Sequence, residues 1–278
     1  MGASKVLTLS GTTIRHLLER YQSTITVRKR GCDRERFKIR VLLRSPLADV
    51  TLQKLTSAMI SSYRDQRMAK VQAATVRREL AILRHCFTVA TKEWGIPLAH
   101  NPFSDVRLPT VNDARSRRLS ANEERRLRSA LTASKAWYLA SIVELALETG
   151  MRRSELLRLE WRNLDLENRI AVLPCTKNGE RREVPLTSLA TRVLKTVPVH
   201  GDLVFPVRAE SMGEAWERLT KRAGLHTLRF HDLRHEAISR FFEMGLSLPE
   251  VALMSGHKDH RMLLRYTHLR PLDLARKL

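Results

Sequence analysis

Apolar residues recur at helical spacing in the first 110 residues. One stripe advances by four and three residues in turn and comprises Val76, Leu80, Leu83, Phe87, Ala90 and Trp94. This is the face that an amphipathic helix buries, and Gly95 followed by Pro97 predicts its end. The opposite face carries Arg77, Arg78, Arg84 and Lys92. Charges of one sign favour phosphate contact, although the same pattern suits a solvated surface.

The second half of the chain mixes helical and strand-like patterns. Residues 137–148 are apolar on most sides and predict a buried helix, which Gly150 ends in a left-handed cap. Short β-like runs at 169–174 and 181–186 flank Asn178-Gly179, a strong signal for a tight hairpin. Lys177 is therefore expected at a hairpin tip. Further helices are expected after Thr187 and over 211–223.

Start and stop signals divide the chain into domains. Ser120 and Glu123 form one capping box and Ser247 and Glu250 another, because each pair can satisfy free backbone amides, and Gly256 is a second expected helix cap. Prolines and a polar, basic run precede the first box. We predict a helical domain over 1–110, a basic linker over 111–118 and a second domain over 119–278. The fold class is mainly α with a small β-sheet (α+β). The linker contains three arginines, Arg115, Arg117 and Arg118. We expect them either to cross a DNA backbone or to lie in a solvated tether.

Charge points to a polyanionic partner. Lys and Arg number 50 against 29 Asp and Glu, a net charge of +21. Residues 1–110 hold 20 basic and 8 acidic residues, a balance of +12, and residues 111–278 hold 30 and 21, a balance of +9. Both halves can therefore contact one polyanion, and nucleic acid is favoured over acidic proteins or membrane surfaces.

Cysteine usage and hydropathy exclude several classes. The three cysteines, Cys32, Cys86 and Cys175, are far apart and lack CxxC spacing, which argues against a disulfide framework or a zinc knuckle. The longest apolar stretch, residues 137–147, is about half a bilayer span, and no signal-peptide pattern opens the chain. The expected setting is a reducing cytoplasm, without a membrane.

Six residues in four segments carry the candidate chemistry. They are Arg152 after a capped helix, Lys177, His231 and Arg234 at helical spacing, His257 after Gly256, and Tyr266 nine residues later. Each alone has a simpler explanation. Arg152 could form a surface ion pair, and Lys177 could be solvated at the tip of the hairpin. The segment that contains His231 could be the start of a helix or a metal site. Tyr266 could belong to the hydrophobic core. Nearby arginines disfavour a bound cation, so we expect no metal.

Together these residues suit phosphodiester transfer without a metal ion or other cofactor. Two guanidiniums, Arg152 and Arg234, can grip the non-bridging oxygens of a phosphate. Lys177 can protonate the leaving 5′ oxygen. His231 can accept the phenol proton, His257 can hydrogen-bond the phosphate, and Tyr266 is the expected nucleophile, forming a covalent intermediate that conserves the bond energy.

The order and the local sequences of these segments resemble those of the tyrosine recombinase (phage integrase) family. Thr149-Gly-Met-Arg-Arg-Ser-Glu155 is similar to the family's first-arginine box, with Glu155 at the supporting acidic position. His231-Asp-Leu-Arg234-His resembles the HxxR box, and Lys177, Gly256-His257 and Tyr266 match the remaining positions. The specific motifs lie within about 120–270.

The resemblance implies a partner and an architecture. Residues 1–110 would be the SAM-like, core-site-binding domain and 119–278 the catalytic domain, closing as a clamp on double-stranded DNA. The family cleaves and rejoins DNA through a 3′-phosphotyrosine, in integration, excision or inversion. It implies a homotetramer assembled on inverted-repeat core sites, a possible directionality factor as a further partner, and a nucleoid-associated setting in the cytoplasm.

Two features depart from the usual pattern. Ser255 stands where Leu is commoner before Gly-His. The surrounding sequence resembles a subset of the family that contains shufflon-type invertases and proteobacterial integrases. Little sequence precedes residue 10, so no separate arm-site-binding domain is expected. After Tyr266, a short helix from Pro271 is expected to dock on its own domain or on a neighbouring protomer. The alternatives to recombination are a type IB topoisomerase-like nicking-closing enzyme and a non-catalytic DNA-binding accessory protein.

Overall fold

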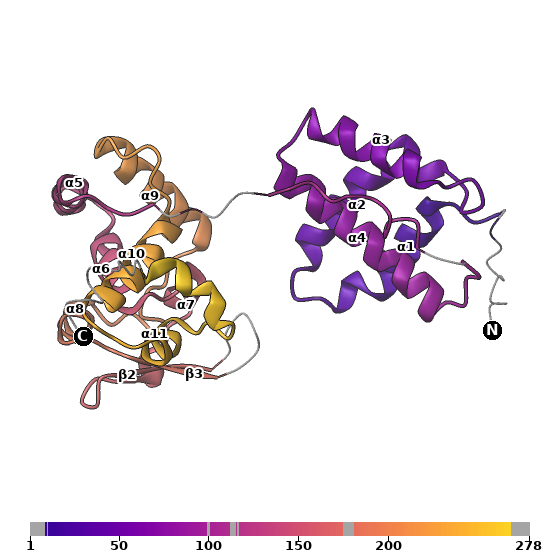
Figure 1. Ribbon diagram of the computed structural model, residues 1–278. Helices are drawn as coiled ribbons and strands as arrows, with labels where there is room; N and C mark the ends of the chain where they lie inside the picture. Colours follow the sequence, from indigo (N-terminus) through magenta and orange to yellow (C-terminus); the bar gives the residue numbers. More distant parts are fainter. Residues whose placement is uncertain are drawn as a thin grey trace, which may run out of the picture. The chain divides into compact units, whose positions relative to one another are not determined.

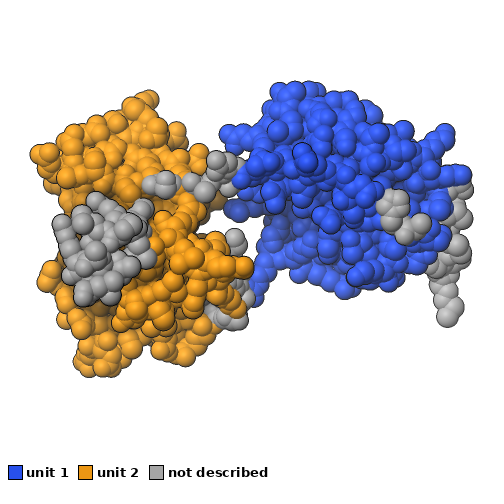
Figure 2. All heavy atoms as spheres, in the orientation of Figure 1, with its two compact units in different colours: residues 1–114 blue, residues 115–278 orange. Residues whose placement is uncertain are grey.

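The chain forms two compact units, residues 1–114 and 115–278, in the computed structural model (Figure 2). The structure describes residues 9, 11–98, 101–111, 115, 117–174 and 181–267. Both units are largely helical, and the second also contains a small antiparallel sheet (Figure 1). The predicted fold class, mainly α with a small sheet, is confirmed.

The first unit is a helical bundle. Its elements are α1 (Ile14–Thr24), η1 (Thr26–Arg28), α2 (Cys32–Leu43), η2 (Pro46–Asp49), α3 (Ser57–Met68) and α4 (Ala73–Lys92). Its core includes Leu17 and Leu18 of α1, Ile39 of α2 and Ile60 of α3, each at most 1% exposed. These helices cover one another because each has a single apolar face to remove from water.

Helix α4 follows the predicted stripe. Val76, Leu80, Leu83, Phe87 and Ala90 are all buried, and Gly95 lies just beyond the helix with φ of 68°. Trp94 is only half-buried, and the guanidinium of Arg20 lies 4.5 Å from the centre of its ring. The predicted helix and its end are therefore confirmed.

The second unit surrounds helix α6. Its helices are α5 (Ala121–Thr132), α6 (Trp137–Thr149), α7 (Arg153–Leu156), α8 (Ser188–Thr196), α9 (Ala209–Arg222), α10 (Phe230–Glu243) and α11 (Leu248–Ser255), with 3₁₀ turns η3 (Trp161–Asn163), η4 (His260–Met262) and η5 (Leu264–Tyr266). Helix α6 packs against α8 and α10, which explains why it is apolar on most sides. Both predicted capping boxes are formed, as are the left-handed caps at Gly150 and Gly256.

A three-stranded antiparallel sheet has the order β1 (Leu164–Asp165), β2 (Ile170–Leu173) and β3 (Arg182–Pro185). The register pairs Leu173 with Arg182 and Ala171 with Val184, so both predicted strands are confirmed. The short strand β1 was not predicted. The expected turn, including Lys177, lies outside the described residues. Helix α11 packs against β3, so that the sheet edge meets the segment before His257.

The structural division falls between residues 114 and 115, inside the predicted linker 111–118. Arg115, Arg117 and Arg118 therefore belong to the second unit. Over the described part of the chain, none of the helices has the length and apolar character needed to cross a bilayer.

Candidate active site

Arg152 lies where α6 ends and α7 begins. Gly150 closes α6 with φ of 62°, a conformation that is strained for residues with a side chain. A Cβ at this position would also lie 3.4 Å from the ring of Phe241. Two residues later, Arg152 occupies the N-cap of α7 in extended conformation. The left-handed turn thus fixes the position of the arginine relative to the core.

The carboxylate of Glu155 organises this corner. It accepts hydrogen bonds from the backbone N of Arg152 at 2.8 Å, from Nη1 of Arg152 at 2.7 Å and from Nη2 of Arg182 at 2.8 Å. Burial alone would raise the pKa of Glu155, but Arg182 and Arg152 outweigh it and hold the pKa below its ordinary value. Within the described chain, Nε and Nη2 of Arg152 carry no hydrogen bond, so one edge of this guanidinium is available to a ligand.

Arg234, in the first half of α10, is 3% exposed. Its Nη1 donates to the carbonyl of Gly150, and its Nη2 donates to the carbonyl of Ser255 at 2.6 Å. Burial and the nearby charge of Arg152 lower the pKa of Arg234 to about 9, which leaves it protonated near neutral pH. Two carbonyls from different helix ends therefore orient one buried cation.

His257 is held by Ser255. The Ser255 hydroxyl has one proton, which it donates to the carbonyl of Val251 at 2.6 Å, and its oxygen lies 2.7 Å from Nδ1 of His257. A carbonyl can only accept, so Nδ1 of His257 must be the donor in the second bond. Burial, then Arg234, Arg152 and Arg182, lower the pKa of His257 to about 4. The neutral ring consequently carries its proton on Nδ1 and leaves Nε2 as an acceptor.

This geometry gives a testable prediction about the His257 tautomer. In the wild-type protein, long-range ¹H–¹⁵N spectra should show His257 with its proton on Nδ1 near neutral pH. Ser255→Ala removes the only side-chain acceptor described for that proton and should move the ring toward the Nε2-protonated form. Ser239→Ala is a matched control, because Ser239 is equally buried but its hydroxyl has no described partner. An unchanged His257 signal in Ser255→Ala would contradict the assignment.

The HxxR segment presents two imidazoles. His231 is exposed at the start of α10, and its ring meets that of His235 edge-on, with centroids 5.0 Å apart. His235 lies one turn further along. Its Nδ1 is hydrogen-bonded to the hydroxyl of Tyr266, and the two rings stack at an angle of 25° with centroids 5.5 Å apart.

Tyr266, in η5, is 7% exposed. Burial raises the pKa of its phenol, while the charges of Arg265 and Arg234 partly oppose that rise. Arg234 also lowers the pKa of His257. The structure therefore brings Arg152, Arg234, His257 and Tyr266 into one electrostatic neighbourhood within a single chain, whereas Lys177 lies outside the described residues.

Three residues outside the predicted catalytic set also belong to this cluster: Arg182, His235 of the HxxR segment, and Ser255, which positions His257. Arg182 is largely buried and bonds both Glu155 and, at 2.9 Å, the carbonyl of Met254. Alternation along β3 offered a signal, because Arg182 shares a strand face with the buried Val184, and a charge on a buried strand face needs a partner. His235 follows Arg234 in the HxxR segment and Ser255 stands where Leu is commoner, but neither observation predicted a contact with Tyr266 or His257.

The three linker arginines have protein partners. Arg115 pairs with Asp232 at 2.9 Å, Arg117 with Glu123 at 2.6 Å, and Arg118 with Glu236 and Glu243 at 2.8 and 2.7 Å. Their charges attach the start of the second unit to α5 and α10. These ion pairs do not fit a solvated tether, and contact of the three arginines with DNA stays a prediction.

The arginines of α4 lie differently. Arg77, Arg78 and Arg84 are exposed, and the first two line a cavity of about 410 Å³ together with Ala74, Ala81 and Val111. Among the described residues, no carboxylate lines this cavity, and its two arginines suit contact with an anion.

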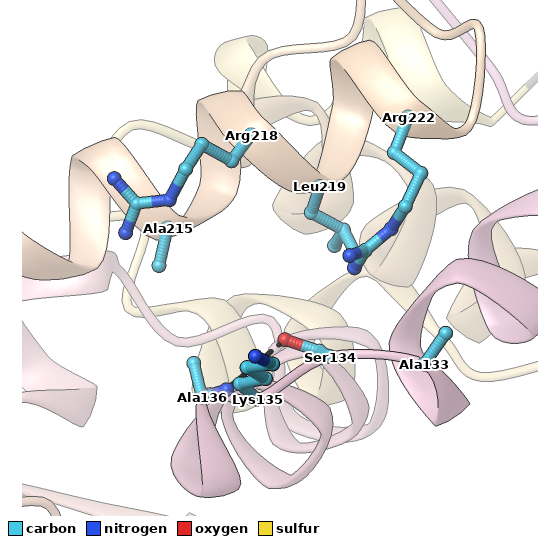
Figure 3. A pocket seen from close by; sticks show the side chains of 8 residues that line it. All are labelled: Ala133, Ser134, Lys135, Ala136, Ala215, Arg218, Leu219 and Arg222. Carbon is cyan, nitrogen blue, oxygen red and sulfur yellow. Dashed lines mark hydrogen bonds between the residues drawn. The ribbon is translucent and has the colours of Figure 1, made fainter.

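A separate cavity of about 280 Å³ lies between the α5–α6 connection and α9 (Figure 3). Lys135, Arg218 and Arg222 contribute basic side chains to its lining, and Arg222 also donates to the carbonyl of Ala130 at 2.9 Å. None of the predicted catalytic residues that the structure describes lines it. The candidate active site is thus distinct from this cavity. No group of three or more His, Cys, Asp or Glu suited to a metal occurs among the described residues.

Fold and site together define the class of tyrosine-type site-specific DNA recombinases. They combine a helical unit, an α+β unit, and buried arginines next to a histidine and a tyrosine. The chain belongs to the phage integrase family, whose sequence profile matches residues 117–272.

Individual relatives agree with this assignment. The chain is 44% identical to the shufflon-specific DNA recombinase of Escherichia coli over 94% of this chain and 70% of that protein. It is 32% identical to a putative integrase/recombinase of Haemophilus influenzae over 91% of this chain and 85% of the relative. The predicted resemblance is therefore confirmed, and the chain is a DNA strand-transferring enzyme.

Solved structures match the fold. The Tn1549 transposon integrase in complex with circular intermediate DNA aligns with a TM-score of 0.79 at 21% identity, covering 96% of this chain and 98% of that one. A lambda integrase tetramer bound to a Holliday junction aligns with a TM-score of 0.77 at 21% identity, covering 92% and 77%.

Proposed function

We propose that Tyr266 is the nucleophile of DNA cleavage. Its oxygen attacks the scissile phosphorus, the bond to the 5′ oxygen breaks, and a 3′-phosphotyrosine forms. The supporting observation is a set of contacts made by helix α10. Arg234 donates to the carbonyl of Ser255, whose hydroxyl holds His257, and His235 is hydrogen-bonded to the hydroxyl of Tyr266.

Arg152 and Arg234 would hold the non-bridging oxygens of the phosphate. Arg152 is suited to this because Glu155 fixes Nη1 while Nε and Nη2 carry no bond in the described chain. Arg234 donates from both terminal nitrogens to carbonyls, and each nitrogen keeps one further N–H. Fixed donors of this kind stabilise the charge that grows on the phosphate oxygens during transfer and need no metal.

His257 would contact the phosphate as an imidazolium. Its neutral form offers only an acceptor at Nε2, and an acceptor repels a phosphate oxygen. Negative charge from a bound phosphate opposes the effect of the three arginines and raises the pKa of His257. Binding of DNA is therefore coupled to uptake of a proton at this ring.

Lys177 would donate a proton to the leaving 5′ oxygen, as its place in the motif order implies. The phenol proton of Tyr266 passes to an imidazole of helix α10. Arg182 and Glu155 would position Arg152 without touching DNA.

We further propose that both units contact double-stranded DNA at inverted-repeat core sites and that four chains assemble there. One relative is a shufflon-specific DNA recombinase, which favours inversion among the possible outcomes, and lambda integrase has been solved as a tetramer on a Holliday junction. An accessory factor that sets direction is a further expected partner, and the nucleoid is the expected place of action.

The test of this proposal is covalent trapping. Inverted repeats that flank the encoding gene are built into duplexes nicked just downstream of the cleavage position, so that the freed 5′ fragment diffuses away and rejoining stops. In the presence of a metal chelator, the wild-type protein should form a covalent adduct whose DNA remnant maps to the peptide containing Tyr266. Binding without an adduct at every bound duplex would instead favour a non-catalytic accessory protein. Relaxation of arbitrary plasmids by the monomer would favour the topoisomerase-like alternative.

The α4 arginines are expected to contribute phosphate contacts in the first unit. In a plot of the logarithm of the binding constant against the logarithm of the salt concentration, each neutralised phosphate makes the negative slope steeper by about 0.9. The triple variant Arg77→Ala, Arg78→Ala, Arg84→Ala should therefore bind the same duplexes more weakly and with a slope shallower by about 2 to 3.

The control is a second triple variant, Arg34→Ala, Arg40→Ala, Arg44→Ala. It removes the same charge from exposed positions on α2 and at the residue that caps its C-terminal end. Equal slopes for the two triple variants would mean that net charge, and not the α4 face, governs binding.

A further inference from the structure

The hydroxyl of Tyr266 has a specific partner in the DNA-free protein. Nδ1 of His235 is hydrogen-bonded to it, and the two rings stack. The phenol is buried and the imidazole is half-buried, so water does not compete freely for this bond. Within the described part of the chain, His235 is therefore the residue that is hydrogen-bonded to the oxygen proposed to react.

We propose that His235, and not His231, takes the phenol proton of Tyr266 during DNA cleavage and returns it during rejoining. This inference rests on the proposed function, in which Tyr266 is the nucleophile. It assigns to His235 a direct catalytic role that the family motif gave to its neighbour one turn earlier.

The direction of the hydrogen bond follows from the chemistry of the two groups. A phenol is the stronger proton donor, and a neutral imidazole offers one nitrogen as an acceptor. Burial and the nearby His231 and Arg265 lower the pKa of His235 to about 4, so the ring is neutral near pH 7 and able to accept. The Tyr266 O–H therefore points at Nδ1, and the proton of His235 lies on Nε2.

Charges on three elements face His235. On α10 these are His231, Asp232 and Arg234, and Arg265 lies on η5 beside Tyr266. Beyond the end of α11, His257 is also within electrostatic range. Asp232 favours the charged imidazole and the arginines oppose it. A phosphate bound by the arginines offsets their charge, which raises the basicity of His235 when substrate is present.

His231 is less well placed for this role. It is exposed at the start of α10, beside the ion pair of Arg115 with Asp232, and it meets His235 ring-to-edge. The imidazole of His235 thus contacts both the ring of His231 and the phenol, with its own Nδ1 on the hydroxyl. A proton that leaves Tyr266 along the existing bond reaches His235 first.

The step is balanced without an added reagent. As the bond from the Tyr266 oxygen to phosphorus forms, the phenol proton moves to Nδ1 of His235 and the bond from phosphorus to the 5′ oxygen breaks. The 5′ oxygen takes a proton from the general acid assigned to Lys177. Rejoining reverses both transfers, so neither residue is consumed.

The experiment compares the pH dependence of adduct formation in single-turnover trapping. With a base in place, the wild-type rate should change little between pH 6 and pH 8. In His235→Asn and His235→Gln, only the ionised phenol attacks, so the rate should fall about 100-fold at pH 7 and rise about tenfold per pH unit, as the tyrosinate population does. His200→Asn, an exposed histidine of the same unit, is the matched control and should behave as wild type.

His231→Asn decides between the two imidazoles. The proposal predicts that it keeps the flat profile, whatever its rate. A tenfold rise per pH unit in His231→Asn, with a flat profile in both His235 variants, would overturn it. Equal binding of the duplexes by all variants shows that they are folded.

A second measurement does not depend on cleavage. In the DNA-free wild type, ¹⁵N-histidine spectra should show Nδ1 of His235 unprotonated, with a signal that Tyr266→Phe shifts. A protonated Nδ1 would contradict the inference even if trapping succeeds. Absence of any wild-type adduct would reject the proposed function, while the spectra would still report on the hydrogen bond.

Discussion

Tyr266→Phe is expected to abolish the covalent DNA adduct and to leave DNA binding intact. Phenylalanine lacks the oxygen that would bond to phosphorus, so no other group in the side chain can replace it. The variant also loses the hydrogen bond to His235, which costs about 0.5–1.5 kcal/mol of stability and is too little to unfold a unit of this size. The measurement is the trapping assay with the wild type and the variant side by side.

Tyr138→Phe is the matched control, because Tyr138 is a partly buried tyrosine in α6 of the same unit. It should form the adduct at the wild-type rate. An adduct of equal yield in Tyr266→Phe would mean that another residue attacks the phosphate, and the site assignment would then be wrong.

Arg152→Lys is expected to reduce the rate of adduct formation by about 100- to 1000-fold, the usual cost of losing a donor to the oxyanion of a transition state. Lysine keeps the charge but lacks the planar fork. The ammonium can pair with Glu155 or reach the phosphate, whereas the guanidinium can bond Glu155 through Nη1 and still present Nε and Nη2. The charge is thus preserved while the bidentate geometry is lost.

The control is Arg153→Lys, the next residue along the chain, whose side chain is exposed. It should cleave as the wild type does. Single-turnover rates at saturating protein separate this effect from binding, since the variant is expected to bind the duplex nearly as well. If Arg152→Lys cleaved at the wild-type rate, charge alone would suffice and the bidentate role would be rejected.

The local signals in the sequence predicted most of the secondary structure. Gly150 and Gly256 end helices in the left-handed conformation, and Ser120 and Ser247 begin helices with capping boxes. Such signals succeed because they depend on a few neighbouring residues and on backbone sterics. The strand β1 was missed because two residues carry no detectable period.

The candidate site was predictable as an ordered set of residues, and their catalytic roles stay predictions. The order of the motifs along the chain identified Arg152, Arg234, His257 and Tyr266 as candidates. It did not predict that Ser255 fixes the tautomer of His257, since that needs the carbonyl of Val251 to take the hydroxyl proton. The sequence left open whether the linker arginines cross DNA or lie in a solvated tether. The carboxylate partners of Arg115 and Arg118 lie on α10, more than 100 residues away, and leave no pattern in the local sequence.

The sequence by itself determined the fold class, the main helix boundaries, the family and the chemical types gathered for phosphate transfer, because periodicity, caps and motif order are local properties. Only the tertiary structure decided which groups touch. It joined Arg182 of a strand to Glu155 of a helix, and it placed His235 instead of His231 on the hydroxyl of Tyr266. The physical reason is that hydrogen bonding depends on distances of a few ångströms between side chains from distant segments, and packing sets those distances.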